Sequence, residues 1–259
     1  MQRSTAGGIP EKGGAGYGRC IGGSSGHRAR PPNCGTEIRG GRILPSPGRT
    51  PILVAMFTGL IEALCAVEDF EPRGKGARLV LARPEFSADR RPWEPEMGES
   101  IAVSGCCLTL TELEEGARPV FDLTAETLAR TWFSSVRPGV LVNLERSLTL
   151  SDRLGGHLVS GHVDGLGHLL ARADVGDGGA VYTFEVSPGF ERYLIEKGSV
   201  SIDGISLTVV EPKERHFDVA LIPETLERTN LGPAEVGQAF HLEADAIGKW
   251  VERLVSPHG

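Results

Sequence analysis

The sequence lacks any apolar run long enough to cross a membrane as a helix. A membrane-spanning helix needs roughly 18 to 20 apolar residues, whereas the longest candidate, residues 52–60, is short and is interrupted by Thr58 and Gly59. The first part of the chain also lacks the apolar stretch of a secretory signal. We therefore expect no membrane association.

Cysteine is scarce, and its spacing excludes the usual cysteine frameworks. The chain has five cysteines, an odd number, and two of them, Cys20 and Cys34, lie in the first 55 residues. No pair has the C-x-x-C spacing, so the sequence shows neither a zinc motif nor a disulfide framework. We therefore expect no bound metal, and a reducing cytoplasm is the natural compartment.

The chain is short of positive charge outside its first 55 residues. That segment carries eight Lys and Arg against two acids, a net charge of +6, whereas the whole chain carries −7, which leaves −13 for residues 56–259. Binding to nucleic acid needs a basic face that neutralises phosphates. The acidic body therefore argues against nucleic acid as the main partner.

Residues 1–55 have no hydrophobic periodicity and contain thirteen glycines. Such a segment cannot bury enough apolar surface to offset the entropy that is lost on ordering. We predict that residues 1–55 form a disordered extension upstream of the true start at Met56 and play no part in the chemistry. The arginines and the few acids leave a transit peptide as the alternative, although no clear amphipathic helix is present.

The remainder of the chain contains an internal repeat of about 100 residues. Four blocks recur in one order at offsets of 98 to 102 residues: 58–62 with 160–164, 98–109 with 197–208, 125–131 with 223–229, and 139–145 with 237–243. Such a unit is far longer than a solenoid repeat, so each copy should be a domain of its own.

Each copy has the short, alternating, β-branched runs of a small barrel. Ile101 and Val103 in the first copy correspond to Val200 and Ile202 in the second, and Gly and Pro interrupt the runs roughly every 8 to 12 residues. We predict an all-β fold of two tandem barrels, the first over residues 56–152 and the second over residues 153–245.

A long helical pattern appears only at the end of the chain. Ile247, Trp250, Val251 and Leu254 fall at the i, i+3, i+4 and i+7 positions of a helix. This apolar stripe has no third barrel to pack on. We therefore expect residues 246–259 to form a helix that is used in self-association.

The Cys106–Cys107 pair lies in one of the repeated blocks. Adjacent residues of a strand point to opposite faces, so at most one of the two thiols lines a given pocket. The second copy has the apolar Ile205 at the position of Cys106 and Ser206 at the position of Cys107. We therefore expect Cys106 to pack in the core and Cys107 to line a pocket.

The glycine-rich stretch 155–165 contains His157 and His162. A spacing of five residues suits neither one face of a strand nor one face of a helix, so a shared metal site is not expected. The flanking glycines permit close approach of a ligand to the backbone. From the residues alone, a functional and a structural role for His162 are equally supported.

Polar residues that alternate onto one face of each copy suggest a binding surface. Small hydroxyls and carboxylates suit a planar ligand that is rich in heteroatoms and hydroxyl groups, although some of these residues also suit turns and helix caps. The set comprises Ser100, Cys107, Thr109, Asp122 and Glu126 in the first copy, and Lys197, Ser206, Thr208, Glu243 and Asp245 in the second.

The repeated blocks closely resemble those of the riboflavin synthases. The matching motifs are M-F-T-G-L-I-E at 56–62, G-C-C-L-T at 105–109, G-G-H-L-V-S-G-H at 155–162, I-D-G-I-S-L-T at 202–208 and L-I-P-E-T-L-E-R-T at 221–229. The resemblance extends from Met56 to about Leu254 and supports Met56 as the start. It implies two six-stranded antiparallel Greek-key barrels and a C-terminal helix that gathers three chains into a homotrimer.

The resemblance also implies an activity. Members of this family convert two molecules of 6,7-dimethyl-8-ribityllumazine into riboflavin and 5-amino-6-(D-ribitylamino)uracil, the final step of riboflavin biosynthesis. The reaction needs no cofactor, and orientation of the two substrates can contribute on the order of 7–11 kcal/mol. Each reacting pair would lie between the first barrel of one subunit and the second barrel of a neighbour. Lumazine synthase is a further candidate partner.

The resemblance assigns roles to residues at the matching positions. The catalytic residues it implies are Ser100, Cys107, His162 and Asp245, with His162 as the expected general acid–base because its ordinary pKa is near neutrality. The substrate-binding residues it implies are Phe57, Thr109, Asp122, Glu126, Thr127, Lys197, Ser206 and Thr208.

Two other classes of function are open to the sequence. A non-catalytic lumazine- or flavin-binding protein of the same fold would need only one competent barrel, whereas both copies here carry the expected residues. A flavin-dependent oxidoreductase would need a nicotinamide-binding region, and no G-x-G-x-x-G motif in a βαβ unit is present. The enzyme is therefore the preferred interpretation.

Overall fold

The computed structural model of the protein describes residues 55–86 and 92–256. Strands dominate this part of the chain, as the sequence predicts. The elements are β1 (Ala63–Arg73), β2 (Gly76–Leu81), β3 (Ser100–Val103), β4 (Cys106–Glu114), β5 (Arg118–Leu123), α1 (Ala125–Arg130), η1 (Trp132–Ser135), β6 (Leu141–Arg146), β7 (Gly165–Asp174), β8 (Ala180–Val186), η2 (Glu191–Tyr193), β9 (Ser199–Ile202), β10 (Ile205–Thr208), β11 (Val210–Lys213), β12 (His216–Leu221), α2 (Pro223–Arg228), β13 (Ala239–Ala244) and α3 (Ala246–Val255).

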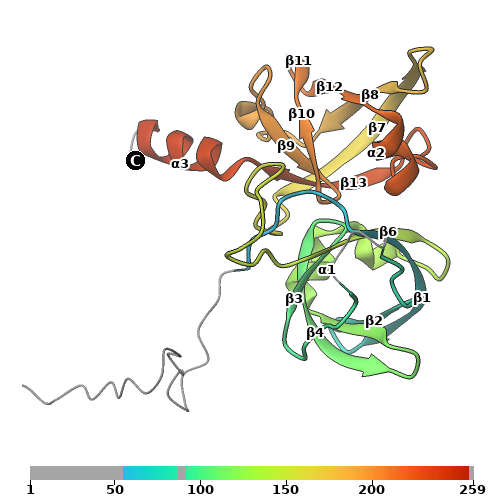
Figure 1. Cartoon of the computed structure of the whole chain (residues 1–259). Helices are drawn as coiled ribbons and strands as arrows, with labels where there is room; N and C mark the ends of the chain where they lie inside the picture. Colours follow the sequence, from blue (N-terminus) through green and yellow to red (C-terminus); the bar gives the residue numbers. More distant parts are fainter. Residues whose placement is uncertain (1–54, 87–91, 257–259) are drawn as a thin grey trace, which may run out of the picture. The chain divides into compact units, whose positions relative to one another are not determined.

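The first six strands form a closed barrel in the order β1-β2-β5-β4-β3-β6 (Figure 1). The hairpin strands β3, β4 and β5 are consecutive, and β2 lies beside β5, which is a Greek-key connection. Alternation along β4 sends Cys106, Leu108 and Leu110 into the barrel core, where they pack with Phe121 and Phe133. Cys106 is thus a core residue, as predicted.

The second sheet has the order β10-β9-β13-β7-β8-β12-β11 and its own core (Figure 1). This order repeats that of the first barrel when β10 and β11 are taken together as the counterpart of β4. The strand is interrupted at Val209, after which Glu211 has a left-handed backbone with φ of 44°. The first barrel has a register shift between Leu110 and Glu112 in the equivalent place. The fourth strand expected in this copy is therefore divided in two, and the structure has a seven-stranded sheet where a six-stranded barrel was predicted.

A buried polar network joins the two barrels. The Asp203 carboxylate accepts hydrogen bonds from the His241 backbone N–H (2.6 Å), the Trp132 indole N–H (3.1 Å) and the Asn230 side-chain amide (2.6 Å). Asn143 of β6 donates to the Asp203 carbonyl oxygen and to Asn230 Oδ1, both at 2.9 Å. Since buried polar groups are costly unless they are paired, this network specifies how the two barrels meet.

The His241 ring makes two contacts that fix its protonation. His241 Nδ1 lies 2.7 Å from the Ser104 carbonyl oxygen, which only accepts, and His241 Nε2 lies 3.1 Å from the Trp132 backbone N–H, which only donates. The ring must therefore be neutral, with its proton on Nδ1. Burial lowers the pKa of His241 to about 3, in agreement with this geometry.

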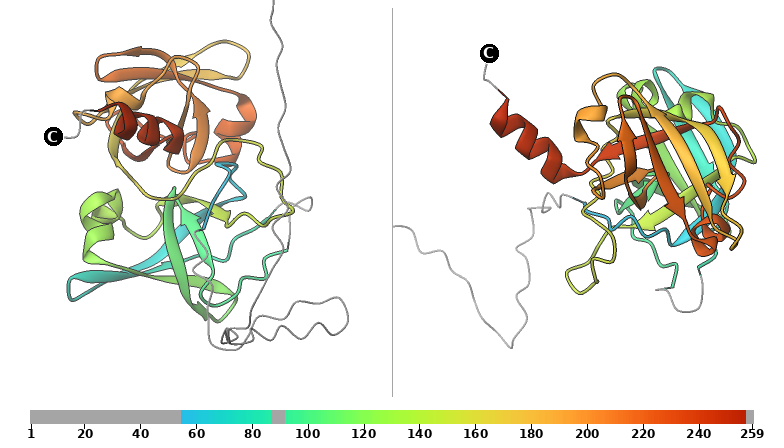
Figure 2. Two further views of the ribbon diagram at one scale, coloured as in Figure 1. Left: turned by 90° about the vertical axis from the view of Figure 1, so that its left-hand side faces the viewer. Right: turned by 90° about the horizontal axis from the view of Figure 1, so that it is seen from above.

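Helix α3 extends the chain beyond the second sheet and stands apart from the strands (Figure 2). Two ion pairs connect it to that sheet's loops: Lys249 with Asp164 (2.6 Å) and Glu252 with Arg192 (3.2 Å). Its apolar stripe is largely uncovered, with Trp250 68% and Leu254 75% exposed. Among the described residues, no helix has both the length and the apolar character needed to cross a membrane.

Candidate functional site

The outer face of the first barrel carries three of the predicted site residues. Ser100 pairs with Thr109, and Ala102 pairs with Cys107, across the β3–β4 hairpin. The residues between them point into the core, so these four side chains share the outward face. Cys107 is half-buried on this face, and its position in a ligand pocket stays a prediction.

The same face continues onto β5 and α1. Leu110 pairs with Phe121, and both side chains lie in the core. Because neighbouring residues of a strand point to opposite faces, Thr109 and Asp122 both point away from the core. Helix α1 follows directly: Thr124 caps its N-terminus by accepting from the Thr127 backbone N–H at 3.1 Å. Glu126 forms an i,i+4 ion pair with Arg130 and is largely exposed. Asp122 and Thr127 therefore border the face, whereas Glu126 lies at its solvent side.

The loop before β7 brings His162 to this face. The Cys107 backbone N–H donates to the Gly161 carbonyl oxygen at 2.8 Å. His162 follows Gly161 directly and is exposed. The structure thus brings Ser100, Cys107 and Thr109 together with the His162 segment.

An equivalent face lies on the second sheet, around Ser206 and Thr208 of β10. The Ser206 backbone N–H donates to the Gly59 carbonyl oxygen at 2.9 Å. Cys107 and Gly161 have the same relationship in the first barrel. The chain therefore presents two similar faces, one on each copy of the repeat.

His157 belongs to the second face, and the sequence interpretation did not include it among the site residues. His157 Nδ1 lies 2.7 Å from Ser206 Oγ. Its Nε2 atom is buried and has no hydrogen-bond partner among the described residues. Burial lowers the pKa of the His157 imidazole, and the charge of Asp245 opposes this shift. A neutral ring with one free buried nitrogen suits a ligand that offers it a polar atom.

Asp245 connects the second face to the C-terminal helix. Asp245 Oδ1 accepts from the Ile247 backbone N–H at 2.9 Å and so caps the N-terminus of α3. Burial lowers the pKa of His157 and the charge of Asp245 raises it, so this carboxylate acts on the ring that contacts Ser206. The predicted catalytic role of Asp245 stays a prediction.

Lys197 and Phe57, two further predicted site residues, have contrasting surroundings. Lys197 precedes β9 in a left-handed backbone conformation (φ of 63°), and its exposed side chain pairs with Glu196 at 3.5 Å. Phe57 is fully buried and packs with Ala102 and Val159. Phe57 therefore supports the first face from beneath.

The predicted position of Glu243 on the binding face is wrong. The structure buries its side chain and directs it to the loop at Ser160 and Gly161. Its position follows from β13, where burial is continuous from Phe240 to Ala244 and does not alternate. A strict alternation of faces was therefore the wrong pattern to apply to this strand.

The thiols differ in their surroundings. Burial raises the pKa of Cys65 and of Cys106 to about 12. Burial also raises the pKa of Cys107, although a hydrogen bond with Ser100 opposes that shift. Cys107 is therefore a neutral thiol rather than a thiolate near neutral pH. Within the described residues, no group of three or more His, Cys, Asp or Glu side chains is placed to hold a metal ion.

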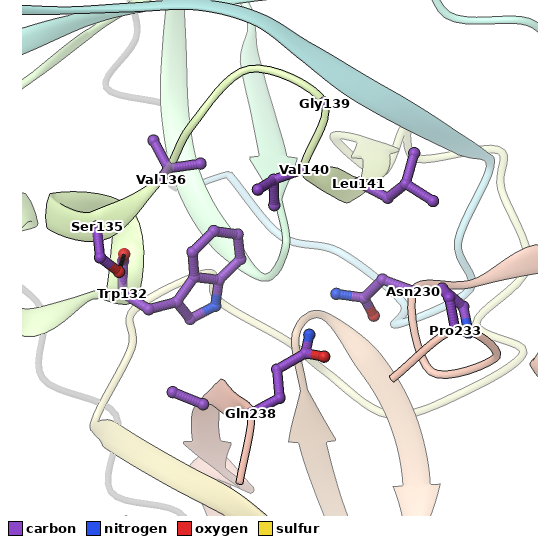
Figure 3. Close-up of a pocket in the computed structure, with 10 residues that line it drawn as sticks. Trp132, Ser135, Val136, Gly139, Val140, Leu141, Asn230, Pro233 and Gln238 are labelled. Carbon is purple, nitrogen blue, oxygen red and sulfur yellow. Dashed lines mark hydrogen bonds between the residues drawn. The ribbon is translucent and has the colours of Figure 1, made fainter. Parts of the chain in front are cut away.

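A separate cavity of about 440 Å³ lies where the two copies of the repeat meet (Figure 3). Trp132, Asn230 and Gln238 line it together with apolar residues of the 136–141 segment. None of its lining residues is charged, and none is a predicted site residue. The two faces described above are thus distinct from this cavity.

The repeat matches a known domain twice. The family model described as the lumazine binding domain matches residues 58–147 and again residues 160–245. The curated relatives include "Riboflavin synthase" of Mycobacterium bovis, 42% identical over 79% of this chain and all of that protein. Others are the riboflavin synthases of Actinobacillus pleuropneumoniae (38%) and Bacillus subtilis (34%), each matched over 77% of this chain and 90% of that protein.

The chain belongs to the riboflavin synthase family. Its relatives carry the name of an enzyme, which supports an enzymatic function of the riboflavin synthase kind. Solved structures of LumP agree in fold: the complexes with 6,7-dimethyl-8-(1'-D-ribityl) lumazine and with riboflavin superpose with TM-scores of 0.62 and 0.64. Each covers 73% of this chain and 98% of LumP, at 20% sequence identity.

Proposed function

We propose that the protein is a transferase that dismutates 6,7-dimethyl-8-ribityllumazine. One molecule passes a four-carbon unit to a second, which gives riboflavin and 5-amino-6-(D-ribitylamino)uracil, the final step of riboflavin biosynthesis. The two products together contain every atom of the two substrates, so no cofactor or oxidant is consumed. The relatives named riboflavin synthase support this reaction.

One observation carries the proposal: the chain has two equivalent faces, and the reaction uses two copies of one molecule. Cys107 with Gly161 on one face corresponds to Ser206 with Gly59 on the other. Each face thus offers a small polar side chain beside a glycine carbonyl group. Two like faces suit two like substrates, and holding them in register is the main catalytic task.

The residues at each face have proposed roles. On the first face, Ser100, Cys107 and His162 serve the reacting part of the lumazine, with His162 as general acid–base. Thr109, Asp122, Glu126 and Thr127 bind the ring and the ribityl chain, and Phe57 supports the pocket from beneath. On the second face, Asp245 serves the reaction, and Lys197, Ser206 and Thr208 bind substrate. We add His157, whose Nε2 has no hydrogen-bond partner in the part of the chain that the structure describes and is suited to a hydrogen bond with the ligand.

We further propose that the reacting pair forms between subunits. The exposed stripe of α3 contains Ile247, Trp250, Val251 and Leu254, and burying it between chains would gather three copies into a homotrimer. The barrel domains, with limits at 56–152 and 153–245, would then meet across the subunit interface. Lumazine synthase remains a candidate partner, and the cytoplasm is the proposed location.

The direct test mixes the purified protein with the lumazine alone and follows the absorbance of riboflavin. The proposal expects riboflavin and the diaminouracil product in equal amounts, one of each for every two molecules of lumazine consumed, with a metal chelator present. A non-catalytic binding protein would leave the lumazine bound and unchanged, and that result would refute the proposal. The relatives at 34–42% identity favour the enzyme.

A further inference from the structure

Two buried carboxylates occupy equivalent positions in the two copies of the repeat and make the same contacts. Glu145, on β6, accepts from Thr58 N–H and Oγ1 (both 2.6 Å) and from Gly59 N–H (2.9 Å). Glu243, on β13, accepts from Ser160 N–H and Oγ (both 2.7 Å) and from Gly161 N–H (2.9 Å). Each carboxyl group thus accepts from three donors of one short segment, residues 58–59 for Glu145 and residues 160–161 for Glu243, and holds that segment in place.

The segment that each carboxylate holds is hydrogen-bonded to the opposite copy of the repeat. Glu145 belongs to the first barrel, but the Gly59 carbonyl oxygen accepts from Ser206 of the second sheet. Glu243 belongs to the second sheet, but the Gly161 carbonyl oxygen accepts from Cys107 of the first barrel. The two segments also pair with each other, through Phe57 and Val159. The contacts are therefore crossed between the barrels.

Each segment packs closely against the face that it contacts. A Cβ atom on Gly59 would lie 2.5 Å from Ser206 Cβ, and a Cβ atom on Gly161 would lie 2.5 Å from Cys107 Cβ. Both glycines also have a left-handed backbone, with φ of 76° and 77°. The position of each segment therefore shapes the wall around Ser206 or Cys107.

We propose that Glu145 is a positioning residue for the Ser206 face and that Glu243 is a positioning residue for the Cys107 face. Each face thus depends on a carboxylate from the opposite barrel. That these faces bind lumazine rests on the function proposed above, but the crossed dependence itself does not.

Replacement of either glutamate by glutamine should loosen its segment. One carboxylate oxygen of Glu145 faces two donors and the other faces one. In either orientation, an amide would therefore point its NH₂ group at a backbone N–H. Glu243 is in the same position. The substitution is nearly isosteric, so it tests the hydrogen bonds rather than the packing.

The test uses a thiol at each face as a reporter of how well the segment covers it. In a Cys20→Ser, Cys34→Ser background, Cys107 reports on the first face, because Cys65 and Cys106 are buried. A second background adds Cys107→Ser and Ser206→Cys, which moves the reporter to the other face. Labelling rates with a disulfide reagent are then measured for Glu145→Gln, Glu243→Gln and a control, Glu112→Gln, whose side chain is 58% exposed.

The crossed arrangement predicts a crossed pattern of rates. Glu243→Gln should raise the labelling of Cys107 about tenfold or more and leave the position 206 reporter within about twofold. Glu145→Gln should do the reverse, and Glu112→Gln should change neither rate. Equal increases at both reporters would indicate general loosening, and increases on the glutamate's own barrel would indicate uncrossed support. Either result, or no increase at all, would overturn the proposal.

A second measurement separates this proposal from the proposed function. The number of lumazine molecules bound per chain should fall from two to one in each glutamine variant, as measured by equilibrium dialysis. If the labelling is crossed but the parent protein binds no lumazine, the positioning role stands and the proposed function fails. If the parent binds two molecules and the labelling is not crossed, the positioning role fails alone.

Discussion

His157 Nδ1 lies 2.7 Å from Ser206 Oγ, which joins the loop between the two copies of the repeat to strand β10 of the second sheet. The other ring nitrogen is buried without a partner among the described residues. A buried nitrogen in this state is costly unless a ligand or water reaches it. The pair therefore marks where a substrate is expected to make a hydrogen bond.

Replacing His157 should lower the activity more than it lowers the stability. His157→Gln is expected to reduce kcat/KM for lumazine at least tenfold, about 1.4 kcal/mol of transition-state stabilisation, because Ser206 and the ligand both lose a ring nitrogen. The control is His168→Gln, since His168 is exposed on β7. Equal kinetics for the two variants would show that His157 has only a structural role.

The stability of the protein should depend on pH through His241. Burial lowers the pKa of His241 from 6.5 to about 3, so between these values the unfolded chain binds a proton that the folded chain does not. The free energy of unfolding should therefore fall as the pH drops below 6.5, by at most about 1.4 kcal/mol per pH unit from this residue. Above 6.5 this contribution should be constant.

The measurement compares denaturant unfolding of the parent and of His241→Asn between pH 7 and pH 4. Asn is the residue at the equivalent position of the first barrel, Asn143. The stability advantage of the parent should shrink as the pH falls, because the variant has no imidazole to protonate. Burial raises the pKa of Asp203 and of Glu145 to about 7, which gives the opposite slope, so only the difference between the proteins is informative. A pH-independent difference would contradict the assignment.

Helix α3 should control the assembly state. Trp250→Glu combined with Leu254→Glu places two charges on the exposed apolar stripe and should yield species smaller than a trimer in sedimentation experiments. Arg253→Glu is the matched control, because Arg253 lies outside the stripe. A double variant that stays trimeric would show that the helix is not the organiser, and so would a trimeric protein that lacks residues 246–259.

Residues 1–54 lie outside the described residues, and their lack of a catalytic role stays a prediction. A protein that begins at Met56 should keep kcat/KM within about tenfold of the full chain, a change smaller than roughly 1.4 kcal/mol. The reason is that the first 55 residues have no core-forming pattern. A larger loss, with the same assembly state, would show that the extension takes part in catalysis.

Much of the fold follows from short-range patterns in the sequence. The repeat predicts two similar sheets, and strand alternation places Cys106 in the core and Cys107 on the outer face. The apolar stripe predicts a helix over residues 246–259, and the structure has helix α3 over Ala246–Val255. These features depend on residues that are close together in the chain, so periodicity is sufficient to find them.

The missed features all depend on contacts between distant segments. His157 meets Ser206 49 residues away, and Glu243 meets Ser160 from 83 residues away. Both contacts depend on how segments that are distant in the sequence pack together. Alternation along one strand carries no information about such packing. The break at Val209 was missed because Glu211 adopts its left-handed backbone without a glycine to signal it.

The most direct test of the account asks whether a reacting pair is shared between chains. Ser100→Ala impairs the first face, and Asp245→Ala impairs the second, so each homotrimer alone should be inactive. In mixed trimers, some interfaces pair an intact first barrel from one chain with an intact second barrel from the other. Co-refolding the two variants should therefore restore part of the riboflavin formation, with a yield that follows the mixing ratio. No restored activity, with mixed trimers verified by mass spectrometry, would contradict the shared site.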